Sequence, residues 1–274
     1  MGRRPKHPRD GYRWLAATAT IVAVDVFDPN SATHRSQLER LRRHLLARIH
    51  RRYQTVTQSL RFGQIEFEFT RIVDPDVVLD QVAREADRRE RTTGTSQADL
   101  DLHLPYWAEL WDSASGIGHF LASSKLDVQS HLSLHVLDLG CGMGLSGTVA
   151  AALGAEVLFA DLEPPALLFA KLNTLPWKHR VHTRRLNWQT DRLEERFDLI
   201  LGADILYEKA QWPFLNAFWQ NHLKDGGSVL LGEPGRQSGE VFLEWVRPLS
   251  WRVEIFEQAV ETRRRPIRIV RLTQ

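Results

Sequence analysis

With 274 residues, 43% of them hydrophobic and 26% charged, the chain has a globular composition and the length for one large domain or a domain with an appendage. No run reaches the roughly 18–20 apolar residues of a membrane span, and the longest candidate, residues 14–27, contains Asp25 and lacks the cleavage site of a secretory signal, so we expect a cytoplasmic protein without membrane contact. The single cysteine, Cys141, excludes an intramolecular disulfide and a zinc site built on cysteines.

The N-terminal part of the chain is strongly basic, although the whole chain carries a net charge of only +2. Residues 1–60 contain 12 Lys and Arg against four acidic residues. Residues 1–13 are predicted to be disordered, and residues 31–53 to form an amphipathic helix with one leucine-rich stripe. We therefore expect residues 1–58 to form a basic N-terminal extension, either a solvated segment or an arm for nucleic acid or acidic partners.

Residues 59–274 are predicted to form the main domain. Apolar and polar residues alternate over 62–72, which indicates a half-buried strand; a helix follows over 74–91 and a polar break over 92–101. We then expect strands at 134–139, 155–160, 181–186, 197–203, 227–232, 251–257 and 266–272, and helices near 113–125, 145–153, 164–174, 209–223 and 238–247. No helix separates the last two strands, so they should pair antiparallel. The pattern predicts an α/β fold with a doubly wound, mostly parallel seven-stranded Rossmann-like sheet ending in an antiparallel hairpin.

The most informative stretch is LHVLDLGCGMGLSG at residues 134–147, which joins an apolar strand to a helix through a glycine-rich turn. Such a turn brings backbone N–H groups and a helix N-terminus to a ligand, where a Cβ would not fit. From Gly142 onward the turn satisfies the dinucleotide pattern G-x-G-x-x-G. In the shifted register, Asp138 is followed by Gly140, Gly142 and Gly144, and this acidic turn resembles that of class I S-adenosylmethionine methyltransferases. The turn alone leaves both cofactors open.

Two carboxylates at strand ends favour the second register. Asp138 is expected to face the cofactor crevice and to hold a methionine ammonium, directly or through water, whereas a dinucleotide turn has no use for an acid beside a pyrophosphate. Asp161 ends the next strand, where a carboxylate can hold both hydroxyls of a ribose. The plainer interpretation of Asp161 is a loop acid that caps the helix opening at Pro164.

Two further strand ends carry polar and aromatic side chains. Asn187 and Trp188 follow the third strand, where an amide can read the edge of adenine and an indole can stack beside it; a core position is the alternative for Trp188. The fourth strand ends in GADILY, so Ala203, Asp204 and Tyr207 should lie over the carboxyl edge of the sheet, where open α/β sheets bind ligands. We expect Ala203 beside the cofactor and the other two beside the acceptor.

Several motifs in this order resemble the seven-strand methyltransferases related to protein-lysine methyltransferases, whose bacterial members are often labelled nicotinamide-N-methylase-like. They are PYWAELWDSA, DLGCGMG, the strand end at Asp161, LNW and GADILY. GEPGR at 232–236 is similar to GDPGR in the branch that methylates the electron-transfer flavoprotein β-subunit on lysine. The resemblance covers about residues 60–274, and Asn187 departs from the Asp of many relatives. It implies S-adenosylmethionine as the cofactor, with Trp111 near it and Asp204 and Tyr207 at the acceptor side.

The chemistry of methyl transfer is consistent with these residues. Displacement at a sulfonium needs a neutral nucleophile held about 3 Å from the methyl carbon, and the protein supplies position and electrostatics while the cofactor supplies reactivity. A lysine ammonium must therefore lose its proton. A carboxylate such as Asp204, with Tyr207 and an aromatic wall of Tyr106, Trp107 and Trp111, is expected to orient the amine.

Protein lysine is the favoured acceptor, and a small-molecule N- or O-methyltransferase is the second hypothesis. RNA ranks third because base methylases usually carry Asn/Asp-Pro-Pro-Tyr/Phe after the fourth strand, and this chain has DILY there. A NAD-dependent oxidoreductase and a catalytically silent cofactor-binding protein rank below these. The eleven histidines show no metal-ligand spacing, so we expect no metal, and we expect a monomer. Glu109 stays undecided between a substrate carboxylate and a polar group at a helix start.

Overall fold

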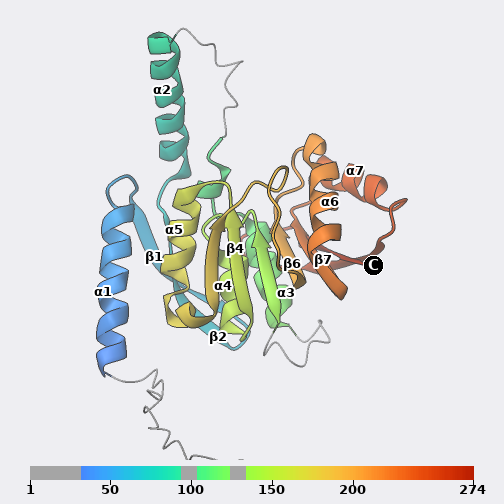
Figure 1. Ribbon diagram of the computed structural model, residues 1–274, viewed down its shortest axis with the longest axis horizontal. Coiled ribbons are helices and arrows are strands. Elements are labelled where there is room, and N and C mark those ends of the chain that lie inside the picture. The colour runs from blue at the N-terminus through green and yellow to red at the C-terminus, as the bar shows by residue number, and fades with distance from the viewer. Residues whose placement is uncertain (1–31, 94–103, 124–133) are drawn as a thin grey trace, which may run out of the picture. The chain divides into compact units, whose positions relative to one another are not determined.

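The computed structural model describes residues 32–93, 104–123 and 134–274 (Figure 1). The chain divides into two compact units, Met1–Gln37 and Leu38–Gln274, and the second contains every described strand. The predictions made for residues 1–13 and 14–27, and for most of the polar break at 92–101, lie outside the described residues. None of the described helices combines the length and the apolar content that crossing a bilayer requires.

The predicted alternation of strands and helices is present from β3 onward. The described helices are α1 (Ala32–Ile49), α2 (Pro75–Thr93), α3 (Asp112–Ala122), α4 (Leu145–Ala152), α5 (Pro164–Asn173), α6 (Trp212–His222) and α7 (Gln237–Val246). The strands are β1 (Thr55–Phe62), β2 (Ile65–Ile72), β3 (His135–Leu139), β4 (Glu156–Asp161), β5 (Val181–Arg185), β6 (Phe197–Ala203), β7 (Leu223–Glu233), β8 (Arg252–Gln258) and β9 (Ile267–Thr273). Short 3₁₀ turns lie at Tyr106–Ala108, Leu175–Arg180 and Lys209–Gln211.

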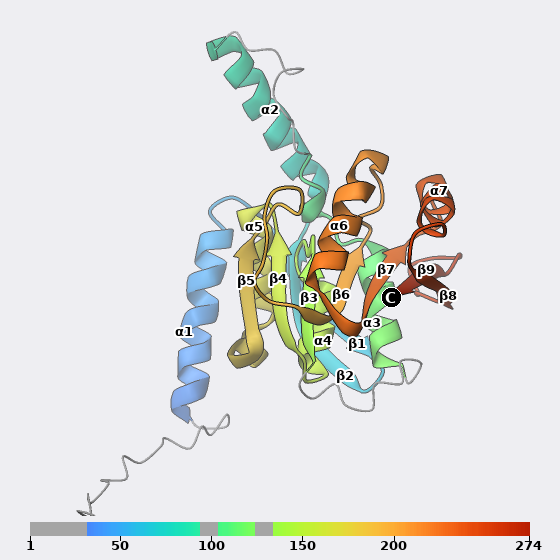
Figure 2. The same ribbon diagram turned by 45° about the vertical axis from the view of Figure 1, so that its right-hand side comes forward.

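Seven strands form one sheet in the order β5-β4-β3-β6-β7-β9-β8 (Figure 2). β3 pairs in parallel with β4 and β6, and parallel pairing continues outward to β5 and β7. β9 inserts between β7 and β8 and runs antiparallel to both. The prediction of a doubly wound sheet closed by an antiparallel pair is confirmed. The strand order reverses between β3 and β6, and such a switch point opens a crevice at the carboxyl ends of the strands.

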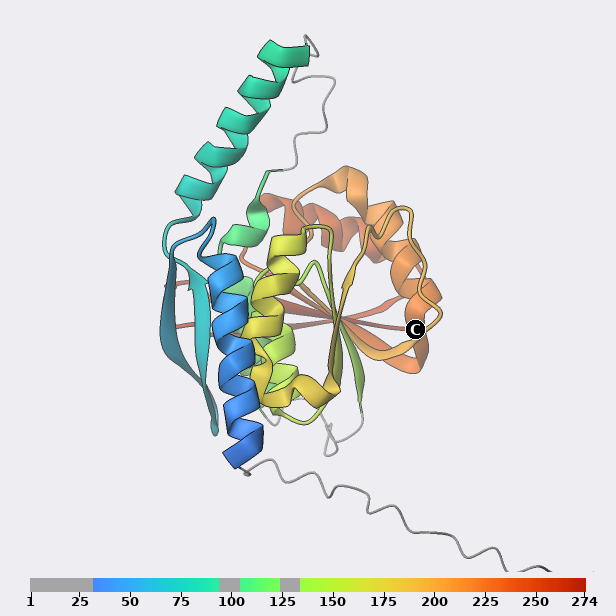
Figure 3. The ribbon, with the colours of Figure 1, turned by 60° about the vertical axis from the view of Figure 1, so that its left-hand side comes forward.

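Helices cover both faces of this sheet (Figure 3), with α3, α4 and α5 on one side and α6 and α7 on the other. Phe120, Val149 and Phe169 are fully buried in the first layer, and Trp219 and Phe242 in the second. Because both faces are covered, the inner strands are apolar on both sides, which is why they read in the sequence as short continuous apolar runs.

The strand predicted over 62–72 is in fact the second half of a hairpin. β1 and β2 form a separate antiparallel pair in which Phe62 lies opposite Ile65. Gly63 makes the turn at φ +58°, a conformation that favours glycine. Sequence reasoning missed β1 because five of its eight side chains are polar, so it carries little apolar signal. The boundary predicted between residues 58 and 59 falls inside this strand.

One buried side chain ties the hairpin to the glycine turn. Asn173, at the end of α5, accepts a hydrogen bond from Thr70 N at 2.8 Å and donates to Thr70 O and Met143 O, both at 3.0 Å. Leaving a buried amide unpaired costs about 1–3 kcal/mol, so these three bonds fix the relative positions of β2, α5 and the turn. The hairpin therefore supports the loop that leads from β3 to α4.

Candidate functional site

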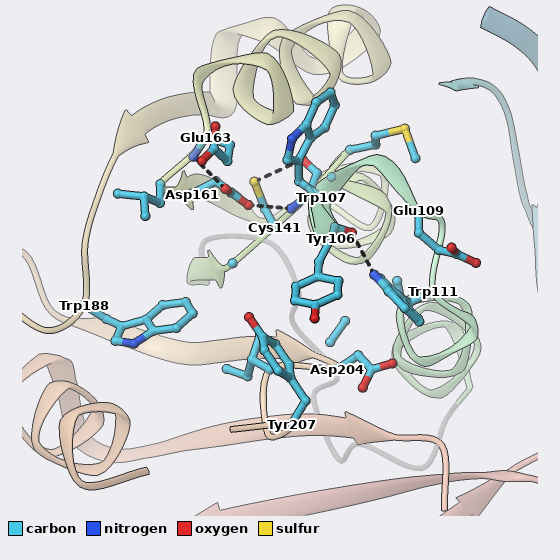
Figure 4. Close-up of a pocket in the computed structure, with 18 of the residues that line it drawn as sticks. Tyr106, Trp107, Glu109, Trp111, Cys141, Asp161, Glu163, Trp188, Asp204 and Tyr207 are labelled. Atoms are coloured by element: carbon cyan, nitrogen blue, oxygen red, sulfur yellow. Dashed lines mark hydrogen bonds between the residues drawn. The ribbon is translucent and has the colours of Figure 1, made fainter. Parts of the chain in front are cut away.

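A cavity of about 450 Å³ opens at the carboxyl ends of β3, β4 and β6, at the predicted crevice (Figure 4). Its volume is in the range of small-molecule sites. Asp161, Glu163 and Trp188 lie on one side of it, and Trp111 and Asp204 on the other. Of the predicted site residues, ten line this cavity: Trp111, Gly140, Gly142, Gly144, Asp161, Asn187, Trp188, Ala203, Asp204 and Tyr207.

The glycine turn forms one wall of the cavity with its backbone. Gly140, Gly142 and Gly144 have φ values of +65°, +52° and +86°, which side-chain-bearing residues rarely adopt. A Cβ on Gly144 would lie 2.9 Å from the Cβ and 3.1 Å from the Cα of Ala170 in α5. Glycine is therefore required here both by the backbone conformation and by the close packing of α5.

Asp161 holds this wall in place from the end of β4. Its carboxylate accepts a hydrogen bond from Gly142 N at 2.8 Å and another from Glu163 N at 2.9 Å. Burial raises its pKa to about 6, and the backbone donors oppose that rise. A carboxylate has about four acceptor positions, so both oxygens can take further hydrogen bonds from a ligand in the cavity. The predicted ligand-holding role and the plainer loop-capping role are thus compatible.

Asp138, the eleventh predicted site residue, lies outside the cavity lining, behind the glycine turn. It is 1% exposed, and its Oδ2 accepts a hydrogen bond from Gly147 N in α4 at 2.9 Å. Burial raises its pKa to about 7. The sequence placed it facing the crevice because it ends β3, but its side chain points at the start of α4, so the carboxylate supports the turn from beneath.

Asn187 and Trp188 form the cavity wall beyond β5. Asn187 Oδ1 accepts a hydrogen bond from Gln189 N at 2.9 Å, which fixes its amide in a tight turn. Trp188 Nε1 donates to Gln211 Oε1 at 3.0 Å, so the edge of the indole is anchored while it lines the cavity. Trp188 also packs against the buried core. Trp188 therefore packs on the core, as the alternative prediction had it, and also lines the cavity, while its stacking beside adenine stays a prediction.

Asp204 occupies the opposite end of the cavity in an unusual conformation. It is the non-glycine residue with a positive φ, +56°, among the described residues. Such backbone strain is concentrated at functional sites. Its side chain is 7% exposed and its Oδ2 accepts a hydrogen bond from Arg236 Nη2 at 3.0 Å. Burial raises its pKa to about 6, and the charge of Arg236 opposes the rise.

Three aromatic side chains surround this end of the cavity. The Tyr106 ring lies 5.1 Å from that of Tyr207 and 6.5 Å from that of Trp111, both in edge-to-face orientation. Trp111 Nε1 donates to Tyr106 O at 2.9 Å. Burial raises the pKa of Tyr207 to about 12, so its hydroxyl keeps its proton at physiological pH. Of the aromatic wall predicted from Tyr106, Trp107 and Trp111, Tyr106 and Trp111 lie at this end, whereas Trp107 lines the cavity elsewhere and packs against Tyr53 and Phe169.

A second cavity, of about 460 Å³, adjoins the first. Trp111 and Asp204 line both, so they stand where the two meet. Glu109 also lines both and is exposed. The remaining walls of the second cavity come from Leu110, Asp112, Pro234, Gly235, Arg236 and Arg263.

Sequence reasoning missed several polar side chains of the site, among them Glu163, Gln211 and Arg236. Glu163 and Gln211 line the first cavity, and Arg236 pairs with Asp204. Glu163 and Gln211 lie in no motif, and only folding brings them to the cavity. GEPGR drew attention to residue 236 as part of a resemblance, but its ion pair spans 32 positions of the chain and has no local signal. Among the described residues, no group of three or more His, Cys, Asp or Glu is placed to hold a metal ion.

Comparison with known proteins gives one family and one fold. A sequence model of the family described as lysine methyltransferase matches residues 106–251. Protein N-lysine methyltransferase METTL21A of Xenopus tropicalis is 39% identical over 132 residues, which cover 45% of this chain and 58% of the relative. Electron transfer flavoprotein beta subunit lysine methyltransferase of Danio rerio is 32% identical over 142 residues, or 50% and 52% of the two chains. This chain spans about half the length of the curated relatives it matches.

Among solved structures, the glycopeptide N-methyltransferase MtfA superposes with a TM-score of 0.50 at 15% identity. The match covers 59% of this chain and 96% of that one. At this level of identity the likeness shows a shared fold.

Proposed function

This chain belongs to the lysine methyltransferase family, and from that membership we propose that it transfers a methyl group from S-adenosylmethionine to the side-chain amine of a protein lysine. The site geometry supports the proposal at two places. One is the backbone-lined wall at the glycine turn, and the other is the buried carboxylate of Asp204 beside an aromatic wall.

The cavity residues fit S-adenosylmethionine. Gly140, Gly142 and Gly144 leave a wall without Cβ atoms that the methionine end can approach. Asp161 has acceptor positions for the ribose hydroxyls, and Trp188 offers an anchored ring face for adenine. When bound, this cofactor supplies an electrophilic methyl group on a sulfonium sulfur.

Asn187, Trp111 and Ala203 complete the proposed cofactor contacts. Asn187 and Ala203 line the first cavity, and Trp111 lines the junction between the two cavities. Asp138 is proposed to act through the glycine turn that it supports, because its carboxylate reaches Gly147 N rather than the cavity.

The acceptor amine is proposed to bind at Asp204. Arg236 is the residue that donates to this carboxylate within the described ranges, and it uses Oδ2, so Oδ1 can accept a hydrogen bond from the amine. The Tyr207 hydroxyl, protonated at physiological pH, and the ring of Tyr106 orient the amine from the other side.

The observation that carries the proposal is the place of Asp204. A strained, buried carboxylate lies at the junction of two cavities, one of which fits the cofactor. A long, thin side chain entering by the second cavity would bring a terminal amine to this carboxylate. The monomeric state and the cytoplasmic location stay predictions.

The decisive experiment offers the protein its acceptors in a cell extract. The chain is incubated with isotope-labelled S-adenosylmethionine and cell extract, half of each reaction is then treated with nuclease, and labelled proteins are digested and sequenced by mass spectrometry. We expect methyl-lysine in one or a few proteins, with the label lost in Asp204→Asn. Label only in small molecules would support the second hypothesis, and label removed by nuclease would support RNA; either result would overturn the proposal.

A further inference from the structure

A cation already occupies the acceptor end of the site. The Arg236 guanidinium donates to Asp204 Oδ2 at 3.0 Å, and its Cζ lies 5.2 Å from the centre of the Trp111 ring. A carboxylate and an aromatic face are the two groups that an ammonium ion would also use. The acceptor amine must therefore bind next to a fixed positive charge.

The position of Arg236 is built by several elements. Glu233, which is 3% exposed at the end of β7, accepts hydrogen bonds from the backbone N–H groups of Gly235 and Arg236. Arg268 of β9 pairs with the other oxygen of Glu233, and Arg263 donates to Pro234 O at 2.9 Å. This bracing holds the 234–236 turn against the cavity, so the guanidinium is held beside Asp204 by the fold.

We propose that Arg236 is a positioning residue that acts through Asp204: it neutralises this carboxylate, so that the acceptor amine binds at the cavity junction in its neutral, nucleophilic form. The proposal rests on the proposed function, because it concerns the amine that the methyl group is transferred to. Arg236 and Asp204 together then favour the loss of the lysine proton before methyl transfer.

Electrostatics gives the direction in which the pKa of the bound amine shifts. An isolated Asp204 carboxylate would favour the ammonium form, raise the pKa of the amine and keep its lone pair blocked. A guanidinium 3.0 Å from that carboxylate cancels the attraction, and as a like charge it disfavours a second cation. Burial then lowers the amine pKa further, and the proton leaves to water through the second cavity. The same principle activates amines that lie beside another cation.

The other charged groups near this point are largely balanced. Those that face Asp204 and Trp111 from the surrounding elements are Glu109, Asp112, Tyr207, Glu233, Arg236 and Arg263. Asp112 pairs with Arg263 at 3.4 Å, and Glu233 pairs with Arg268. Tyr207 is neutral, and Glu109 is exposed to solvent. Removing the charge of Arg236 would thus leave Asp204 as the one buried, unbalanced charge at the junction.

The test measures the protonation of a bound amine directly. The probe is n-butylamine, the lysine side chain without its backbone, labelled with ¹³C next to nitrogen so that its chemical shift reports protonation. It is titrated from neutral to alkaline pH with the full chain loaded with S-adenosylhomocysteine. We expect the parent chain to lower the pKa of the bound amine, and Arg236→Gln to raise that pKa by about one unit relative to the parent.

Two further variants separate charge from structure. Arg236→Lys keeps the positive charge and should give a bound-amine pKa close to that of the parent. Arg252→Gln removes an arginine from an exposed ion pair on β8 and should change nothing. If the parent binds no amine, or if Arg236→Gln and the parent give the same bound-amine pKa, the assignment of Arg236 is wrong.

The same measurement distinguishes this inference from the proposed function. A parent chain that lowers the amine pKa but methylates no protein lysine in cell extract would defeat the proposed function and leave the role of Arg236 intact. If the chain methylates protein lysine but the bound-amine pKa does not depend on Arg236, the proposed function stands and the role of Arg236 is wrong.

Discussion

Around the glycine turn the backbone itself forms the surface of the cavity, whereas around Asp204 the surface is formed by side chains from separate segments. Gly140, Gly142 and Gly144 are three of five consecutive residues. Trp111 precedes α3, Tyr207 follows β6 and Arg236 follows β7, and the fold brings them together. The first surface is fixed by local conformation and tolerates little change, while the second can change its side chains without changing the fold.

The largest effect is expected where backbone and packing act together. Gly144→Ala meets both a left-handed φ, which costs about 1–2 kcal/mol, and contact with Ala170, where overpacking costs about 1–3 kcal/mol. We expect a loss of about 2–5 kcal/mol in the free energy of unfolding and loss of S-adenosylhomocysteine binding. Urea unfolding and calorimetry measure the two effects.

Gly226→Ala is the matched control for this substitution. Its φ is +75°, but nothing lies within 4 Å of an added Cβ. It should therefore show only the conformational cost, about 1–2 kcal/mol. Equal losses in the two variants would contradict the claim that packing against α5 fixes the turn.

The next effect tests the carboxylate that the backbone wall depends on. Asp161→Asn removes the charged acceptor for Gly142 N and for ligand hydroxyls, and hydrogen bonds to charged groups contribute about 1.5–3 kcal/mol. We expect S-adenosylhomocysteine to bind about 10–100-fold more weakly by calorimetry. Asp204→Asn should leave this affinity unchanged, since Asp204 is proposed to bind the acceptor; a similar loss in both variants would contradict the proposed division of the site into a cofactor side and an acceptor side.

The difference between these two parts of the site also explains which of its residues could be predicted from the sequence. The glycine turn, Asp161 and Trp188 were found because each lies at the end of a strand or within three residues after it, and the carboxyl ends of parallel strands meet at one edge. The hairpin β1–β2 was missed because most side chains of β1 are polar. Gln211 and Arg236 were given no role because their contacts join distant segments, and no local pattern encodes such a contact.

Asp138 shows a second limit of prediction from the sequence. Its position at the end of β3 was predicted correctly, but the direction of its side chain depends on α4, whose Gly147 N attracts the carboxylate. A strand end specifies which edge of the sheet a residue occupies. It does not specify whether the side chain enters the cavity or supports the wall from behind.

A smaller effect tests that supporting role through pH. Burial raises the pKa of Asp138 from 3.8 in the unfolded chain to about 7, so the folded state binds more protons and the free energy of unfolding falls as pH rises from about 4 to 7. Asp138→Asn carries no titrating group and should remove this decline, about 1.4 kcal/mol for each unit by which the pKa is raised. Urea unfolding of the parent chain and of Asp138→Asn at about pH 4.5, 6 and 8, values that span the range in which the carboxyl group titrates, measures this difference. If the free energies of unfolding of the two chains change equally with pH, Asp138 takes up no proton in this range and its carboxylate is charged throughout.

The smallest effect is expected at Tyr207, on the proposed acceptor side of the cavity. Tyr207 has a pKa raised to about 12, so its hydroxyl is a hydrogen-bond donor at physiological pH and not a base. Tyr207→Phe keeps the ring contact with Tyr106 and should reduce kcat by at most about tenfold, near 1.4 kcal/mol, without moving the pH profile. Tyr207→Ala should cost more, since it also removes the ring. A pH profile shifted by Tyr207→Phe would mean that the hydroxyl gives up its proton during turnover, and the amine would then lose its proton to the protein instead of to water.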